Sequence, residues 1–267
     1  MCDPAQTPAE DGGGGRWRGL GAMSMRITQS VRQVTGVLAA GAVLMLGLSG
    51  TATAQPAQAP ACPTLEGCYG YQDMQAFYDE LIALVDGFSA ASYSSMSRPV
   101  YRYVPSGTQR STACIDTTGA PAVADGTTFN YCPADQTVYV GQDSLHELYS
   151  LSGDAAAALG LAHEWGHHVQ TVVGVSATVV SQLGAIQSEN QADCIAGAFL
   201  GHLDARGILE PDDYADVNTV LPKIASGEDD LGRVHGTISE RAAAVDLGLG
   251  QGLGACNTYF PDTPVIV

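Results

Sequence analysis

The sequence predicts an α+β domain with a small β-sheet and a helical core. Three observations carry this prediction. Apolar residues recur at helical spacing over residues 72–90, β-branched and aromatic residues cluster in short runs between residues 100 and 140, and helical patterns return after residue 141. A run of strands followed by a run of helices is typical of α+β folds.

The segment before this domain has the design of a secretory signal peptide. Two arginines precede an apolar run over residues 34–49, which is shorter than the ~20 residues of a membrane-spanning helix. The small residues 52–54 then form an A-x-A cleavage site. We expect translation from Met23 or Met25, because the Gly-rich stretch before them fits no signal peptide, and cleavage after residue 54. The mature chain is then exported, to the cell envelope or the exterior, without a membrane span.

The length and the net charge of the chain limit how many domains and which partners we expect. A chain of 267 residues has room for one domain with a substantial core. We expect a signal region over residues 1–54, a linker with an N-terminal disulfide over residues 55–70, and a single domain over residues 71–267. The formal net charge of −17 repels phosphate backbones, so nucleic acid is not expected as a partner.

Cysteine usage agrees with export. Cys2 lies in the segment that cleavage removes, and the other six of the seven cysteines are an even number, as expected in an oxidising compartment. Pairing between neighbours along the chain predicts the disulfides Cys62–Cys68, Cys114–Cys132 and Cys194–Cys256. The alternative, a zinc cluster of cysteines, lacks the C-x-x-C spacing of such sites.

The predicted elements begin with a helix over residues 72–90. Strands are expected at residues 100–104, 129–132 and 137–140, with a turn at residues 133–135, because Pro and Asp favour turns. Residues 137–140 are the candidate edge strand, to which an extended peptide substrate can add its own backbone.

Helices dominate the second half of the domain. Asp154 is the expected N-cap of a helix that ends near Gly174, and another helix is expected from about residue 179 to residue 203. The acidic residues 208–232 contain Pro and Gly and predict a surface loop or short helices. Residues 237–240, Thr-Ile-Ser-Glu, have the pattern of a capping box that opens a final helix.

The strongest chemical signal is the run His163-Glu164-Trp165-Gly166-His167. Residues i and i+4 lie on the same face of a helix, so the two imidazoles can share one zinc ion. Glu164 lies about 100° around the helix axis from His163, where it reaches a metal-bound water rather than the metal. The spacing therefore predicts two zinc ligands, His163 and His167, and a general base, Glu164.

A catalytic zinc takes three protein ligands and leaves one position open. Glu189, on the next predicted helix, is our candidate for the third ligand. Asp193 falls one turn later on the same face, where it can accept the Nδ1 proton of His163. Two carboxylates at this spacing repel each other unless a cation lies nearby. The alternative is that this polar stretch is a solvated face of the helix.

These motifs resemble those of a known family, the bacterial "putative neutral zinc metallopeptidases". The similarity is carried by residues 163–170, 189–197, 235–237, 131–136 and 256–258, within roughly residues 70–260. The resemblance implies a zincin-like fold, one zinc ion per chain and hydrolysis of peptide bonds. It implies that His163 and His167 are ligands, that Glu164 is the base, and that Glu189 is the third ligand.

Further interpretations stay open at this point. His235 precedes the capped final helix, where it either donates to the oxyanion formed during hydrolysis or has a structural role. Arg241 either balances a buried carboxylate or forms a surface ion pair. The predicted function, an exported zinc metallopeptidase that acts on peptides or proteins, also has two alternatives: a non-catalytic zinc-binding module on the same fold, or a cell-surface interaction domain held by disulfides.

Overall fold

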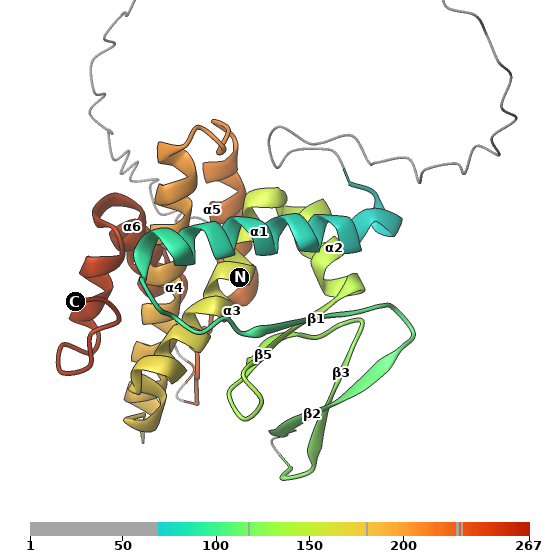
Figure 1. The fold of residues 1–267 in the computed structure, drawn as a ribbon, viewed down its shortest axis with the longest axis horizontal. Helices are drawn as coiled ribbons and strands as arrows, with labels where there is room; N and C mark the ends of the chain where they lie inside the picture. The colour runs from blue at the N-terminus through green and yellow to red at the C-terminus, as the bar shows by residue number, and fades with distance from the viewer. Residues whose placement is uncertain (1–68, 117, 180, 228–229, 231) are drawn as a thin grey trace, which may run out of the picture. The chain divides into compact units, whose positions relative to one another are not determined.

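A computed structural model of the chain describes residues 69–116, 118–179, 181–227, 230 and 232–267. The predicted signal region, the linker and the predicted Cys62–Cys68 disulfide lie outside these residues. The described residues belong to one unit, Ala57–Val267, which Figure 1 shows as a ribbon. Within them, every helix is too short or too polar to cross a membrane.

The first long helix, α1 (Met74–Ser92), follows a 3-10 turn at Tyr71–Asp73. Its apolar side chains recur at helical spacing and are buried on one face. These buried residues are Met74, Phe77, Tyr78, Leu81, Val85 and Phe88. The Phe88 ring lies 5.6 Å from the Trp165 ring, centroid to centroid. The buried face of α1 therefore covers the helix that carries the H-E-x-x-H run.

A three-stranded sheet has the order β1-β5-β4. The central strand, β5 (Thr137–Gly141), pairs in parallel with β1 (Val100–Val104) and antiparallel with β4 (Phe129–Cys132). All five residues of β5 are buried. The prediction that residues 137–140 form an edge strand is therefore wrong, because neighbours occupy both of its sides. The two edge strands of this sheet are β1 and β4.

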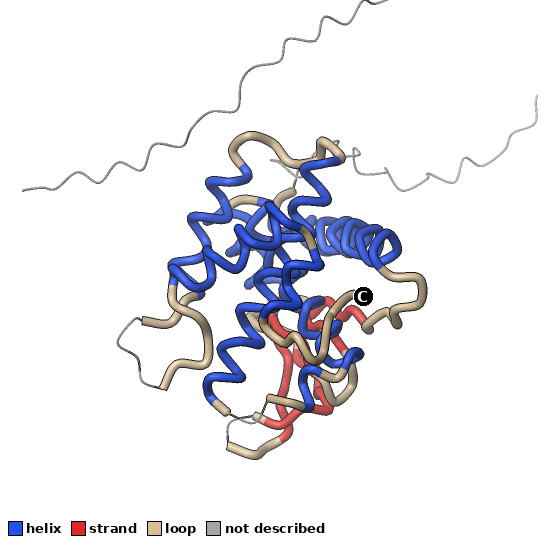
Figure 2. Tube along the Cα trace, turned by 90° about the vertical axis from the view of Figure 1, so that its left-hand side faces the viewer, coloured by secondary structure: helices blue, strands red, loops and turns tan. Residues whose placement is uncertain are grey.

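Two further strands escaped the sequence analysis. Strands β2 (Gln109–Ile115) and β3 (Pro121–Asp125) form an antiparallel hairpin that extends away from the helices in Figure 1. Most of their side chains are exposed or half-buried, so the apolar alternation that signals a strand is weak. Figure 2 shows all the strands gathered at one end of the domain, with the helices filling the rest.

Two helices follow β5 in close succession. Helix α2 (Gln142–Ser152) ends at Gly153, which has a φ of 86° and serves as the N-cap of α3 (Asp154–Val173). Asp154 is thus the first residue of α3 and not its N-cap as predicted. A φ in this region favours glycine, which explains why the chain turns between the helices at Gly153. Helix α3 ends at Gly174, as predicted.

Helices α4 (Gln182–Ala205) and α6 (Ile238–Gln251) approach each other backbone to backbone. A methyl group on Gly248 would lie 1.8 Å from the Cys194 carbonyl oxygen, and one on Gly197 would lie 2.1 Å from the Val245 carbonyl oxygen. Helix α6 opens with the predicted capping box. A disulfide between Cys194 and Cys256 joins α4 to the 3-10 turn Leu253–Thr258 that follows α6.

The acidic segment contains a helix, α5 (Asp213–Ile224), so of the two predicted alternatives the structure has the helical one. Its apolar face is buried through Val217, Val220 and Leu221. This face packs on the domain core, which places α5 near the start of α3 and beside the site described next.

Candidate active site

The H-E-x-x-H run lies on α3, where the helix presents both imidazoles to the same side. The Nε2 atoms of His163 and His167 face each other at 3.1 Å. From α4, Glu189 reaches both rings: its Oε2 lies 3.3 Å from His163 Nε2 and its Oε1 lies 3.4 Å from His167 Nε2. The structure thus brings the three predicted ligands together, although they come from two helices.

The residues fit a zinc ion. His163 Nδ1 contacts Asp193 Oδ1 at 2.8 Å and His167 Nδ1 contacts Gln170 Oε1 at 2.9 Å. Both contacts are to acceptor oxygens, so each Nδ1 carries the proton of its ring. The lone pairs of the two Nε2 atoms then point at each other, and a cation between them relieves their repulsion. Ligand atoms of a tetrahedral zinc at 2.0–2.1 Å lie about 3.3 Å apart, close to the observed separations.

The electrostatics of this cluster favour positive charge. Glu189 Oε2 is buried and has no hydrogen-bond partner. Burial disfavours ionised Glu189, yet the two histidine rings, 3.3 and 3.4 Å from its oxygens, hold the pKa of its carboxyl group well below the ordinary value. Burial also disfavours a charged His163, but the Asp193 and Glu189 carboxylates raise its pKa to about 10. The pocket between the three side chains therefore attracts a proton or a metal cation.

Asp193 and Arg241 form a buried ion pair behind the cluster. Arg241 donates from Nε to Asp193 Oδ2 at 2.8 Å and from Nη2 to Oδ1 at 2.7 Å, and from Nη1 to the Ile224 carbonyl at 2.7 Å. Arg241 is 3% exposed and Asp193 is fully buried. The surface ion pair that the sequence left open for Arg241 is therefore excluded. This pair holds the Asp193 carboxylate against His163.

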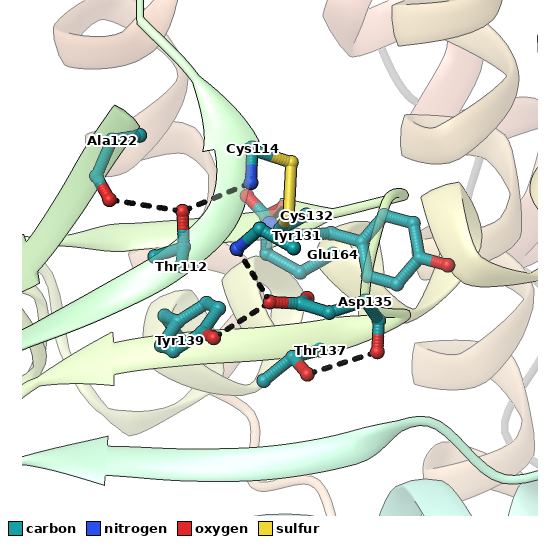
Figure 3. The surroundings of a disulfide bond; sticks show 10 residues. Thr112, Cys114, Ala122, Tyr131, Cys132, Asp135, Thr137, Tyr139 and Glu164 are labelled. Carbon is teal, nitrogen blue, oxygen red and sulfur yellow. Dashed lines mark hydrogen bonds between the residues drawn. A yellow bond between two sulfur atoms is a disulfide. The ribbon is translucent and has the colours of Figure 1, made fainter. Parts of the chain in front are cut away.

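Glu164 is held by the sheet. The main-chain N–H of Tyr131, on β4, donates to Glu164 Oε2 at 2.7 Å. The next residue, Cys132, forms a disulfide with Cys114 on β2, and Figure 3 shows this disulfide beside Tyr131 and Glu164. Burial raises the pKa of the Glu164 carboxyl group above its ordinary value, against the lowering effect of the two histidines. A carboxylate with a raised pKa is a better proton acceptor.

Comparison with known proteins assigns a family. The model of a family described as "Putative neutral zinc metallopeptidase" matches residues 4–239. The chain is a member of this metallopeptidase family. Its H-E-x-x-H run, Glu189 and Asp193 all fall within the matched range.

The curated relatives that match this chain have names that state no activity. The chain is 34% identical over 155 residues to "Uncharacterized protein YpfJ" of Escherichia coli K12, covering 48% of this chain and 53% of the relative. It is 29% identical over 160 residues to "Uncharacterized protein Rv2575" of Mycobacterium tuberculosis H37Rv, covering 48% and 54%. The chain therefore spans about half the length of the curated relatives it matches. No solved structure matches it.

A cavity of about 450 Å³ opens beside His163 and Glu164. Its wall is largely apolar and comes from α2, α3, α5 and β4. The larger apolar lining residues are Phe129, Leu148, Leu151, Leu159, Val220 and Ile224, and polar or charged side chains, among them Glu147, Lys223 and Arg241, line the rest. Sequence analysis missed this wall, because α5 and α2 converge only through tertiary packing. The apolar face of α5 was the one local signal for it.

His235 lies at the edge of the same cavity. Its Nε2 is 3.6 Å from Glu189 Oε2, and 46% of its side chain is exposed. Burial of the rest of the ring lowers the pKa of His235 below its ordinary value. His168, one residue after His167, points away from the cluster: it contacts the Tyr131 hydroxyl at 3.2 Å and the Ser97 carbonyl at 2.6 Å.

Proposed function

We propose that this protein is an exported zinc-dependent peptidase that hydrolyses peptide bonds. The observation that carries the proposal is the convergence of His163, His167 and Glu189 on one point, with the carboxylate of Glu164 held alongside. Three ligands with an open fourth position are typical of catalytic zinc sites. Membership of a metallopeptidase family supports the same chemistry.

In this proposal, His163, His167 and Glu189 would hold one zinc ion per chain. The ion would supply Lewis-acid chemistry, lowering the pKa of a water molecule and polarising a carbonyl oxygen. Glu164 accepts a proton from the attacking water. Tyr131 holds Glu164 Oε2, so Oε1 is the atom that takes this proton and returns it to the amine that leaves.

Other side chains position the ligands or stabilise charge in the site. Asp193 accepts the Nδ1 proton of His163 and keeps Nε2 free for the metal. Arg241 keeps Asp193 ionised inside the domain. His235 lies at the cavity edge, where donation from its ring to the carbonyl oxygen of the substrate would stabilise negative charge as it develops. A structural role for His235 is the alternative.

The apolar cavity supports a preference for substrates with a large apolar side chain next to the cleaved bond. A cavity of about 450 Å³ lies within the range of small-molecule pockets, and its walls favour burial of apolar surface. Export is supported by the disulfides Cys114–Cys132 and Cys194–Cys256 among the described residues, since such bonds persist in oxidising compartments.

The decisive experiment compares the wild type with Glu164→Gln on a peptide library, with zinc content measured by mass spectrometry. The proposal expects one zinc per chain in both proteins, cleavage next to large apolar residues by the wild type, and a 10²–10⁴-fold lower rate for the variant. Zinc without cleavage in the wild type would instead favour a non-catalytic binding module. Absence of zinc from both would favour a disulfide-held interaction domain.

A further inference from the structure

Carboxylates also meet at a second place, at the starts of α3 and α5. Asp154 is the first residue of α3 and Asp213 is the first residue of α5. One ligand oxygen from each of Asp154, Glu210 and Asp213 lies within 4.8 Å of the others. Two helix starts and the segment before α5 therefore bring three acidic side chains to one point.

Asp216, one turn into α5, adds a fourth carboxylate. A methyl group on Gly153 would lie 1.7 Å from Asp216 Oδ2. The Asp216 carboxylate thus packs directly over the backbone that precedes Asp154. Glycine at position 153 supplies both the positive φ and the space for this contact.

Two of these carboxylates are buried and two are half-buried, and they are incompletely paired. Asp154 is 3% exposed and Asp213 is 2% exposed. Asp154 Oδ1 accepts from the Ala155 N–H at 2.9 Å, and Asp213 Oδ2 accepts from the Glu210 N–H at 2.7 Å. Asp154 Oδ2 and Glu210 Oε2, however, are buried without a hydrogen-bond partner. Buried carboxylate oxygens without partners are destabilising unless a ligand satisfies them.

The described part of the chain supplies no basic side chain to balance this charge. None of its ion pairs joins a Lys or Arg to Asp154, Glu210, Asp213 or Asp216. Lys223 of α5 donates instead to Ser152 Oγ at 2.7 Å and to a main-chain carbonyl. Two helix N-termini contribute together about one positive charge, which is less than three or four carboxylates require.

We propose that Asp154, Glu210 and Asp213, with Asp216 beside them, bind a calcium ion. Every donor is a carboxylate oxygen, the hard ligand that calcium prefers. Calcium takes six to eight oxygens at 2.3–2.6 Å in irregular geometry, so its ligand oxygens lie up to about 5 Å apart, as they do here. Magnesium requires near-octahedral geometry and retains several waters, which suits an enclosed cluster of carboxylates less well.

Protons are the competing ligand. Burial and the neighbouring Asp213 carboxylate raise the pKa of Asp154 to about 7, and burial with Asp213 and Asp212 raises the pKa of Asp216 to about 6. In mildly acidic solution a shared proton relieves the repulsion. Above pH 7 the cluster ionises, and a cation takes over this role. Calcium affinity therefore increases from pH 6 to pH 8.

The site has a structural consequence for the apolar cavity. Val220 and Ile224 of α5 line that cavity, as do Leu148 and Leu151 of α2. A cation between the starts of α3 and α5 fixes α5 against α3, and so fixes one wall of the cavity. The acidic segment over residues 208–232, which the sequence predicted as a surface loop or short helices, thereby contributes one wall of the cavity.

A chelating resin first removes loosely held cations from the purified mature protein. The test is then a titration with calcium that is monitored by calorimetry. Zinc content is measured before and after the resin step. We expect one calcium per chain and a melting temperature that increases by roughly 5–10 °C at a calcium concentration of 100 Kd. Neither readout depends on zinc or on hydrolysis, so failure here leaves the peptidase proposal intact.

Three variants locate the site. Asp154→Asn keeps the acceptor for the Ala155 N–H, and Glu210→Gln changes a half-buried side chain outside the helices, so both variants should fold. Each variant is expected to weaken calcium binding at least tenfold. Asp246→Asn makes the same change of charge on the exposed face of α6 and should bind as the wild type does. No calcium binding by the wild type, or unchanged binding by both site variants, overturns the proposal. Equal affinity for magnesium overturns the choice of calcium.

Discussion

The main-chain N–H of Tyr131 donates to Glu164 Oε2 at 2.7 Å, and this bond joins the sheet to the proposed general base. A backbone donor is more rigid than a side chain, because the strand pairing of β4 with β5 holds it in place. The base is thus oriented by a strand that is itself tied to β2 through Cys114–Cys132.

Removing that disulfide should reduce catalysis more than zinc binding. In Cys114→Ser/Cys132→Ser, the cross-link over 18 residues is lost, which costs about 3 kcal/mol in the chain-entropy model. Greater freedom of Tyr131 should lower kcat about tenfold or more, since small misplacements of catalytic groups are costly. Steady-state kinetics and zinc content are the measurements.

The matched control is Cys194→Ser/Cys256→Ser, whose cross-link spans 62 residues and contributes about 4 kcal/mol. Cys194 follows Asp193 on α4, so this variant should weaken zinc binding. An unchanged kcat in the first variant would contradict the role given to Tyr131.

Asp193→Asn should weaken zinc binding 10–100-fold, because the carboxylate that holds the Nδ1 proton of His163 is lost. The change also leaves Arg241 as a buried cation without its counter-charge, which costs about 3–5 kcal/mol of stability. Zinc affinity is measured by competition with a chromophoric chelator, and stability by urea unfolding. Asp246→Asn, with the same change of charge on an exposed face, should alter neither; equal affinities for all three proteins would contradict this prediction.

The acidic cluster should make stability depend on pH in calcium-free buffer. The pKa of Asp154 is about 7 in the folded protein and about 3.9 in an unfolded chain. The folded state therefore binds more protons between these values, and the contribution of Asp154 to the free energy of unfolding falls as pH increases from about 4 to 7. Above pH 7 that loss is complete.

Asp154→Asn removes this titration while it preserves the shape of the side chain. The variant should be more stable than the wild type at pH 8 and about equally stable at pH 4. Urea unfolding at both pH values, with the zinc content held constant, is the measurement. A change in the free energy of unfolding of the same size and sign at both pH values would show that the Asp154 carboxyl group does not titrate as described.

Gly248→Ala should destabilise the domain by about 1–3 kcal/mol, because the new methyl group would lie 1.8 Å from the Cys194 carbonyl oxygen. Helices α4 and α6 would have to separate, which also moves Arg241 away from Asp193. Gly250→Ala is the control on the same helix, because its methyl group meets nothing within 4 Å. It should be neutral or stabilising by about 1 kcal/mol. Equal melting temperatures for the two variants would refute the close contact.

Local sequence determined the parts of this protein that depend on helix periodicity and on caps. The spacing of His163 and His167 places both imidazoles on one face of a helix, whatever surrounds it. The end of α3 at Gly174 and the capping box of α6 are likewise properties of a few consecutive residues. Glu189 and Asp193 could be predicted from the sequence for the same reason, since they lie one turn apart on α4.

Tertiary structure decided what joins these helices to the rest of the domain. Tyr131 acts through its main-chain N–H, which any residue carries, so no side-chain pattern marks it. The Arg241–Asp193 pair, the apolar cavity and the cluster around Asp154 each combine residues from separate elements. Their positions follow from how close α4 and α6 approach and from how α5 packs on α3. The central place of β5 in the sheet has the same origin, because strand order depends on pairing between distant segments and not on local propensity.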